Sequence, residues 1–180
     1  MFKSITYFAV LVLLFLSCQN TKIQNEVKSD DFQKLDTETS ISMNKYWVED
    51  EAFKITQYCE RQGWKTKVSK SGLHYMLIEK GQGDVSPKVG DEVVLSYDIR
   101  LMDPDKTRCY HSDTNGLAKF KMEQSLVESG LHEVVSYLIK GDSALVVLPF
   151  YLAHGIAGNS DKIPPLASVL YYIKIIDVKV

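Results

Sequence analysis

Residue types that build metal sites are scarce in this chain, which has three cysteines and four histidines among its 180 residues. No histidine stands at zinc-ligand spacing from a cysteine or from another histidine, so the sequence predicts no metal site and no cofactor. The G-x-S-x-G pattern of a hydrolase nucleophile is absent. No two acidic residues share an apolar setting that would suit a glycosidase pair. These absences disfavour metal-dependent and nucleophilic hydrolases.

An excess of charge of one sign is also lacking, because 21 basic residues stand against 23 acidic ones, for a formal net charge of −2. The basic residues neither cluster nor interleave with aromatic residues, so nucleic acid is not a predicted partner. With 45% hydrophobic and 24% charged residues among 180, the composition suits one domain of ordinary size with an additional segment attached to it.

The first residues resemble an export signal. Lys3 precedes a mainly apolar run over 5–16, which is too short for the roughly 20 residues of a membrane-spanning helix. Phe15 disfavours ordinary signal-peptidase cleavage after residue 17, whereas "FLSC" resembles a bacterial lipobox, although Phe15 stands where Leu is usual. We therefore expect a signal peptide over 1–17 and lipidation of Cys18. The alternative is an uncleaved anchor.

The expected location follows from this signal. Either form of anchor places the domain outside the cytoplasm, and we expect it in the cell envelope, lipid-anchored to a membrane with the domain in the periplasm. Residues 18–42 are polar without a period and predict a flexible tether.

Residues 43–64 predict a helix with Asn44 as N-cap and Gly63 as the stop. Its apolar positions recur at spacings of four, three and four residues: Val48, Ala52, Ile55 and Cys59. We expect this helix to pack on its own domain. A docking or dimerisation role is the alternative, so the oligomeric state stays open.

The remaining segment, residues 65–180, predicts one domain with a single internal helix over 130–139. The apolar stripe of that helix consists of Leu131, Val134, Val135 and Leu138. Ser129 is the expected N-cap and Gly141 stands just past the end, while His132 is expected to be solvated. Strand patterns surround the helix at 72–81, 91–102, 118–122, 143–149 and 168–180. The predicted fold class is α+β, an antiparallel sheet wrapped around one short helix and preceded by an N-terminal helix.

Three segments together carry a resemblance to a known family. "GDEVVLSYDIRL", "GLHEVVSYLIKGDSALVVLP" and "LAHGIAG" followed by "KIPPLASVLYYIKIIDV" resemble, in order and spacing, successive parts of FKBP-type peptidyl-prolyl cis-trans isomerases. The resemblance covers residues 72–180 and implies an FKBP-like fold. With the lipobox, tether and first helix, the layout is similar to that of the gliding-motility-associated isomerase lipoproteins.

The resemblance implies a membrane-anchored isomerase that assists the folding of exported proteins, with proline-containing exported polypeptides as partners. It also implies an apolar bowl between helix and sheet. Tyr97, Phe120, Val127, Ile163 and Tyr171 would line the bowl, and Glu128 would offer its backbone amide to the bound peptide.

Five further positions depart from the family's usual residues. Cys109 stands where Phe is usual, Tyr110 where Asp is usual, Ala118 where a second Phe is usual, Leu131 where Trp forms the floor, and His154 where Tyr caps the ligand. Tyr110 retains a hydroxyl that could donate a hydrogen bond, whereas Cys109 and Ala118 should widen the bowl. We expect altered peptide binding, and the alternative function is a non-catalytic proline-peptide-binding or assembly module. Cys59 and Cys109 are expected as free buried thiols rather than a disulfide.

Overall fold

The computed structural model describes residues 29–84 and 86–179, with side chains from residue 37 onward. The predicted signal peptide, Cys18 and the first part of the predicted tether lie outside these residues. The chain divides into two compact units, Met1–Asn44 and Lys45–Val180. Within the described residues, no helix is both long enough and apolar enough to cross a membrane.

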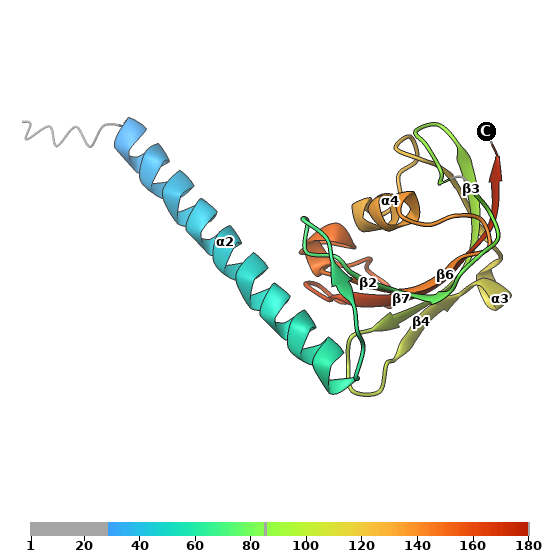
Figure 1. Ribbon diagram of the computed structural model, residues 1–180. Coiled ribbons are helices and arrows are strands. Elements are labelled where there is room, and N and C mark those ends of the chain that lie inside the picture. Colours follow the sequence, from blue (N-terminus) through green and yellow to red (C-terminus); the bar gives the residue numbers. More distant parts are fainter. Residues whose placement is uncertain (1–28, 85, 180) are drawn as a thin grey trace, which may run out of the picture. The chain divides into compact units, whose positions relative to one another are not determined.

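The second unit is built on a seven-stranded antiparallel sheet, counted over the described residues (Figure 1). Its strands are β1 (Lys67–Val68), β2 (His74–Glu79), β3 (Glu92–Leu101), β4 (Arg108–His111), β5 (Ala118–Lys121), β6 (Ser143–Leu148) and β7 (Val169–Lys179). The order is β1-β2-β6-β7-β3-β4, and β5 pairs with β3. The long central strand β7 therefore joins the two halves of the sheet, pairing with β3 on one side and β6 on the other.

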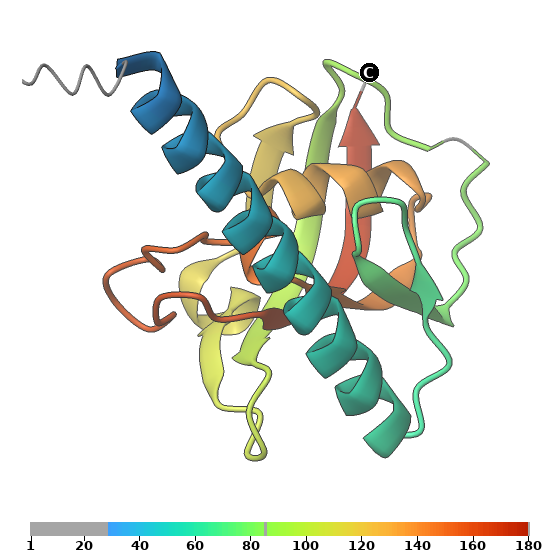
Figure 2. The same cartoon turned by 90° about the vertical axis from the view of Figure 1, so that its left-hand side faces the viewer.

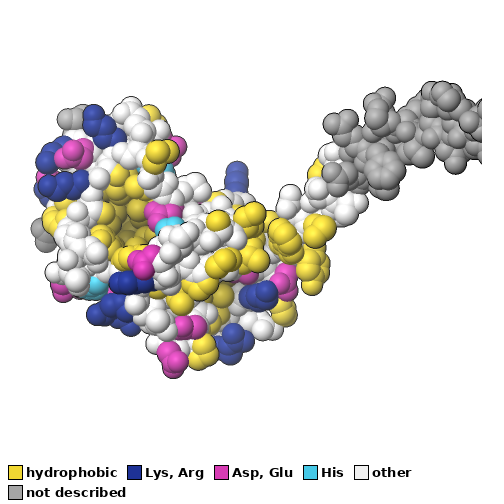
Figure 3. Space-filling model, turned by 180° about the vertical axis from the view of Figure 1, so that it is seen from behind, with side chains coloured by type: hydrophobic (Ala, Val, Ile, Leu, Met, Phe, Trp, Pro, Cys, Tyr) yellow, Lys and Arg dark blue, Asp and Glu magenta, His cyan; other side chains and the backbone are white. Residues whose placement is uncertain are grey.

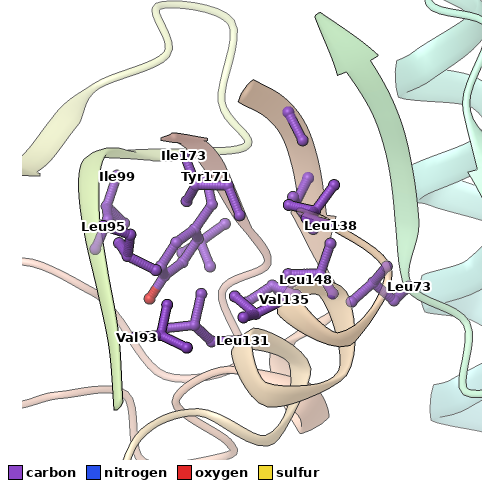
Figure 4. Packing of buried hydrophobic residues seen from close by; sticks show 14 of the residues in the cluster. Leu73, Val93, Leu95, Ile99, Leu131, Val135, Leu138, Leu148, Tyr171 and Ile173 are labelled. Atoms are coloured by element: carbon purple, nitrogen blue, oxygen red, sulfur yellow. The ribbon is translucent and has the colours of Figure 1, made fainter. Parts of the chain in front are cut away.

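Helix α4 (Ser129–Ser136) supplies the other layer of the core. The predicted stripe is confirmed, because Leu131, Val134, Val135 and Leu138 are all at most 5% exposed. They pack with alternate residues of β3 and β7 in one hydrophobic cluster (Figure 4). The helix lies close to β6, since a Cβ on Gly130 would come within 2.5 Å of the Leu148 side chain. The predicted fold, an antiparallel sheet around one short helix after an N-terminal helix, is confirmed.

Details around α4 differ from expectation. Glu128, not Ser129, is the N-cap residue. His132 is 7% exposed rather than solvated, because its Nδ1 accepts a hydrogen bond from the Glu123 N–H at 3.2 Å and its Nε2 bonds the Ser125 carbonyl at 3.0 Å. The imidazole thus holds the loop that precedes α4 in place through two hydrogen bonds to its backbone. Four short elements were not predicted: the strands β1 and β4, helix α3 (Ser112–Asn115) and the 3-10 helix η1 (Phe150–Leu152).

Helix α2 (Ser29–Arg61) is a continuous helix of 33 residues (Figure 2). The segment predicted as a flexible tether is therefore helical over residues 29–42, and Asn44 is an interior residue of the helix rather than its cap. Side chains at 37–49 are exposed. A helix that buries no face shows no apolar period, and once nucleated it gains a hydrogen bond with each added residue. The predicted stop is confirmed, because Gly63 has a φ of 70° and the Trp64 N–H bonds the Cys59 carbonyl.

The last turns of α2 belong to the second unit and pack on its sheet. Ile55, Tyr58 and Cys59 are at most 6% exposed and form a second cluster with Val147 of β6 and Leu170 of β7. The prediction that this helix packs on its own domain is confirmed for these turns, although Val48 remains 41% exposed. Because β6 and β7 are covered on both faces, β6 is a continuous apolar run instead of an alternating one.

Candidate active site

An apolar bowl of about 260 Å³ opens between β3, β5, β7 and the start of α4. Its lining residues are Leu95, Tyr97, Ile99, Tyr110, Ala118, Lys119, Phe120, Val127, Glu128, Leu131 and Tyr171. Strand alternation explains the strand residues of this set except Lys119, because residues two apart on β3 and on β5 face the same side of the sheet. Leu95, Ile99 and Lys119 were not predicted for the bowl, although Leu95 and Ile99 belong to the alternating pattern of β3.

Three residues predicted for the bowl are not among its lining: Ile163, Cys109 and His154. Ile163 is 1% exposed and Cys109 is 3% exposed, and both pack inside the hydrophobic core. The Asn159 side chain holds Ile163 in place, since its Oδ1 accepts the Ile163 N–H at 2.9 Å. Cys109 lies with its Sγ 3.6 Å from the Lys162 carbonyl. Neither residue therefore widens or lines the bowl. Cys59 and Cys109 are both buried and free, as expected.

Tyr110 lines the bowl, but its hydroxyl is already engaged. It donates to Asp161 Oδ2 at 2.8 Å and accepts from Asn159 Nδ2 at 2.6 Å. The Lys162 ammonium lies 5.0 Å from the centre of the Tyr110 ring. The expected donation to a bound peptide is thus replaced by a tie between β4 and the 153–168 loop.

Tyr171 and Glu128 form a polar contact at the base of the bowl. The Tyr171 ring projects between Leu95 of β3 and Leu131 of α4 (Figure 4), and its hydroxyl donates to Glu128 Oε1 at 2.8 Å. Burial, followed by the charge and hydrogen bond of Glu128, raises the pKa of Tyr171 well above its ordinary value. The hydroxyl therefore stays protonated and acts as a donor. The role of the Glu128 side chain was not predicted, because Tyr171 is 43 residues away in the chain.

His154 is the third member of this polar group. Its Nε2 lies 3.1 Å from the same Glu128 oxygen, with side chains 20% and 18% exposed. The contact is not aligned as a hydrogen bond, so His154 Nε2 is buried without a hydrogen-bond partner in the described part of the chain. His154 does not line the bowl itself. It lines a second, shallower hollow of about 510 Å³, with Leu126, Val127, Glu128 and Ala153, which we call the flanking hollow.

Two donors at the bowl remain available to a ligand. Neither the backbone N–H of Glu128 nor the Tyr97 hydroxyl has an acceptor within residues 29–84 and 86–179. The Glu128 N–H stands at the N-terminus of α4, where helix N–H groups lack intrahelical partners and attract carbonyl oxygens. No group of three His, Cys, Asp or Glu side chains suited to a metal ion occurs in the same residues. The bowl can therefore enclose an apolar ring and bind the carbonyl groups beside it.

Comparisons with known proteins agree with this geometry. The family model for FKBP-type peptidyl-prolyl cis-trans isomerases matches residues 83–176. The chain is 31% identical over 123 residues to the FKBP-type peptidyl-prolyl cis-trans isomerase FkpA of Escherichia coli K12, covering 68% of this chain and 43% of that protein. It is 32% identical over 128 residues to a probable FkpA of Neisseria meningitidis, covering 71% and 44%. The chain thus spans less than half the length of these curated relatives.

Solved structures give the same fold. The crystal structure of FkpA from Escherichia coli matches with a TM-score of 0.59 at 27% identity, over 88% of this chain and 74% of that one. The N-terminal domain of FKBP42 from Arabidopsis thaliana also matches with a TM-score of 0.59, at 22% identity, over 64% of this chain and 93% of that one. The second likeness concerns the fold alone.

Proposed function

The chain belongs to the FKBP-type peptidyl-prolyl cis-trans isomerase family, and on that premise we propose that its bowl catalyses the cis–trans isomerisation of X-Pro bonds in polypeptides. One observation carries the proposal. An apolar bowl of about 260 Å³ is walled by Phe120, Leu131 and Tyr171, and two unpartnered donors stand at its edge. A proline ring fits the apolar walls, and the donors suit the peptide carbonyls beside it.

Apolar walls serve this reaction because of amide resonance. Resonance holds the peptide bond planar, with a rotation barrier of about 18–20 kcal/mol. The planar form places charge on the carbonyl oxygen, which water stabilises, whereas the twisted transition state is less polar across the C–N bond. A dry bowl that fits the twisted form lowers the barrier without proton transfer or a nucleophile. The Glu128 N–H holds the peptide in register while the bond turns.

A rate assay with matched variants tests the proposal. The purified chain should accelerate isomerisation of X-Pro peptides in a protease-coupled or NMR exchange assay. Val127→Asp places a charge in the wall of the bowl and should remove most of this acceleration. Val68→Asp changes a residue that is 59% exposed and outside the bowl, and should leave it intact. Failure of the unmodified chain to accelerate any X-Pro peptide would overturn the proposal.

A holding module is the second candidate, and specific residues favour it. Ala118 and Leu131 stand where the family usually has larger aromatic residues, and the Tyr110 hydroxyl is occupied by Asp161. Such a bowl could bind an X-Pro segment without turning it. The same experiment separates the two functions, because a holding module would bind the peptide in a Val127-dependent way while leaving its isomerisation rate unchanged.

We further propose that the mature chain begins at a lipidated Cys18, in the cell envelope with its domain in the periplasm, and assists the folding of exported proteins. The apolar run at 5–16 and the "FLSC" sequence support this anchor. The layout that follows supports a place among the gliding-motility-associated isomerase lipoproteins. A Cys18→Ser variant should lose both the lipid mass and membrane association. Retention of membrane association at an unchanged mass would contradict the anchor.

A further inference from the structure

The bowl and the flanking hollow share a wall made by Val127 and Glu128. Figure 3 shows an apolar hollow with acidic and histidine side chains at its edge. Consecutive Cα atoms of a peptide are about 3.8 Å apart. A chain that places proline in the bowl therefore brings a neighbouring residue to the flanking hollow. This second hollow has an apolar side, including the fully exposed Leu126, and a polar side made by Glu128 and His154.

Glu128 is the acidic residue in this wall, and its carboxylate is only partly satisfied. Oε1 accepts the Tyr171 hydroxyl at 2.8 Å, but Oε2 makes no hydrogen bond to the described residues. The side chain is 18% exposed, so the charge still contacts water. A peptide that covers the hollow would remove this water. Loss of water from a charge without a new partner opposes binding, whereas a cationic partner compensates for it.

Lys119, the basic residue in the lining of the bowl, does not neutralise Glu128. It lies on β5 between Ala118 and Phe120, which face the bowl, so its side chain projects from the opposite face of the strand. Consistent with that placement, the Lys119 charge contributes to lowering the pKa of Glu92 on β3, after the larger effect of Lys179. His154, whose Nε2 lies 3.1 Å from Glu128 Oε1, adds positive charge here only when its imidazole is protonated. With a neutral imidazole, the carboxylate of Glu128 determines the charge of the shared wall.

We propose that the flanking hollow binds the residue next to the substrate proline and that Glu128 makes it select lysine or arginine there. This inference rests on the proposed function of the bowl and names its substrate class. A basic side chain packs its aliphatic stem on Leu126 and Val127 and brings its charge to the Glu128 carboxylate. A leucine at this position leaves the carboxylate dehydrated, and a glutamate meets like charge.

Two series of peptides test this selectivity. Lysine, leucine or glutamate stands directly before the proline in the first series and directly after it in the second. Isomerisation is measured as kcat/KM, and binding is measured separately by NMR titration. At one of the two positions, lysine should be preferred over leucine by about tenfold, as expected for one charge-assisted hydrogen bond. The preference should appear in KM and in the NMR affinity, and it should shrink at high salt.

Two carboxamide variants assign the effect. Glu128→Gln keeps an oxygen that can accept the Tyr171 hydroxyl but removes the charge, and should abolish the lysine preference. Glu133→Gln removes a charge from the same helix that faces Ser71 and Tyr137 instead, and should keep it. Equal binding of all peptides, or a lysine preference that survives Glu128→Gln, would overturn the inference. If no peptide is isomerised, the proposed function fails, while the NMR affinities still decide the question of selectivity.

Discussion

Tyr97 offers the bowl a hydroxyl that no described residue engages. Its replacement by phenylalanine removes a donor to the peptide while preserving the apolar ring. One neutral hydrogen bond corresponds to about 0.5–1.5 kcal/mol, so Tyr97→Phe should lower kcat/KM by about 2–10-fold. The matched control is Tyr75→Phe, because Tyr75 stacks on Tyr137 outside the bowl. Equal activity of the two variants would show that the Tyr97 hydroxyl does not contact the substrate.

The buried imidazole of His74 makes the free energy of unfolding depend on pH. It is 3% exposed, and burial lowers its pKa from the ordinary value. The unfolded chain takes up a proton near pH 6.5, while the folded chain does so only at lower pH. The free energy of unfolding should therefore fall as pH decreases below about 6.5, until the folded His74 also becomes protonated.

Urea unfolding of wild type and His74→Gln at several pH values between 7.5 and 5 measures this contribution. The variant should lose part of the wild-type pH dependence while retaining a partner for Thr66, whose hydroxyl lies 3.1 Å from His74 Nδ1. Identical pH dependence in both proteins would mean that His74 takes up its proton equally well in the folded and unfolded chains.

Residue identities predicted part of the bowl well. Tyr97, Phe120 and Tyr171 lie on strands, and the alternation of side chains along each strand places them on the predicted face of the sheet. Ile163 belongs to a loop without a period, so its path into the core depends on the Asn159 side chain. The contact between Glu128 and Tyr171 joins distant segments, and no local pattern could have indicated it.

The loop between β5 and α4 is an element whose shape depends on one imidazole. His132 bonds the backbone at Glu123 and Ser125, and the same loop carries Val127 and the N-cap Glu128. His132→Phe keeps a ring against Phe120 but leaves these two backbone groups unsatisfied. We expect a loss of about 1–3 kcal/mol in the free energy of unfolding and weaker peptide binding.

Amide hydrogen exchange localises this effect. In the His132→Phe variant, exchange at the Glu123 amide should accelerate more than exchange at amides in the second half of α4. A uniform acceleration throughout the domain would indicate global destabilisation instead. It would contradict the role of His132 in stabilising this loop locally.

At the scale of elements, the periodicity of apolar residues predicted the helix and strands that bury one face. Strands β3 and β7 and helix α4 each bury one face, so their apolar residues recur with the period of the element. Side chains at 37–49 of α2 are exposed, and this stretch consequently shows no such period. Strand β4 has only four residues, and its pairing with β3 is a tertiary effect that its own sequence does not encode.

At the scale of the whole molecule, the last turns of α2 are part of the domain, although the family match begins only at residue 83. Ile55 is fully buried against the outer face of the sheet with Val147 and Leu170. Glu51 is 7% exposed and accepts a hydrogen bond from Ser168, which in turn accepts the Phe150 N–H at 3.0 Å. Removal of these turns would expose an apolar sheet face.

A comparison of two alanine variants on α2 tests this dependence. Ile55→Ala deletes buried methylene and methyl groups and should lower the free energy of unfolding by about 2–5 kcal/mol. Phe53→Ala, two residues away on the same helix but 63% exposed, should change it by less than about 0.5 kcal/mol. Chemical unfolding followed by circular dichroism and by tryptophan fluorescence measures both values, in a Trp47→Phe background so that the emission comes from Trp64. Because Trp64 packs against the cluster of Ile55, a single cooperative transition should be seen by both probes. A tryptophan transition that precedes loss of the sheet, or equal stability of the two variants, would show that the helix rests on the domain without belonging to its core.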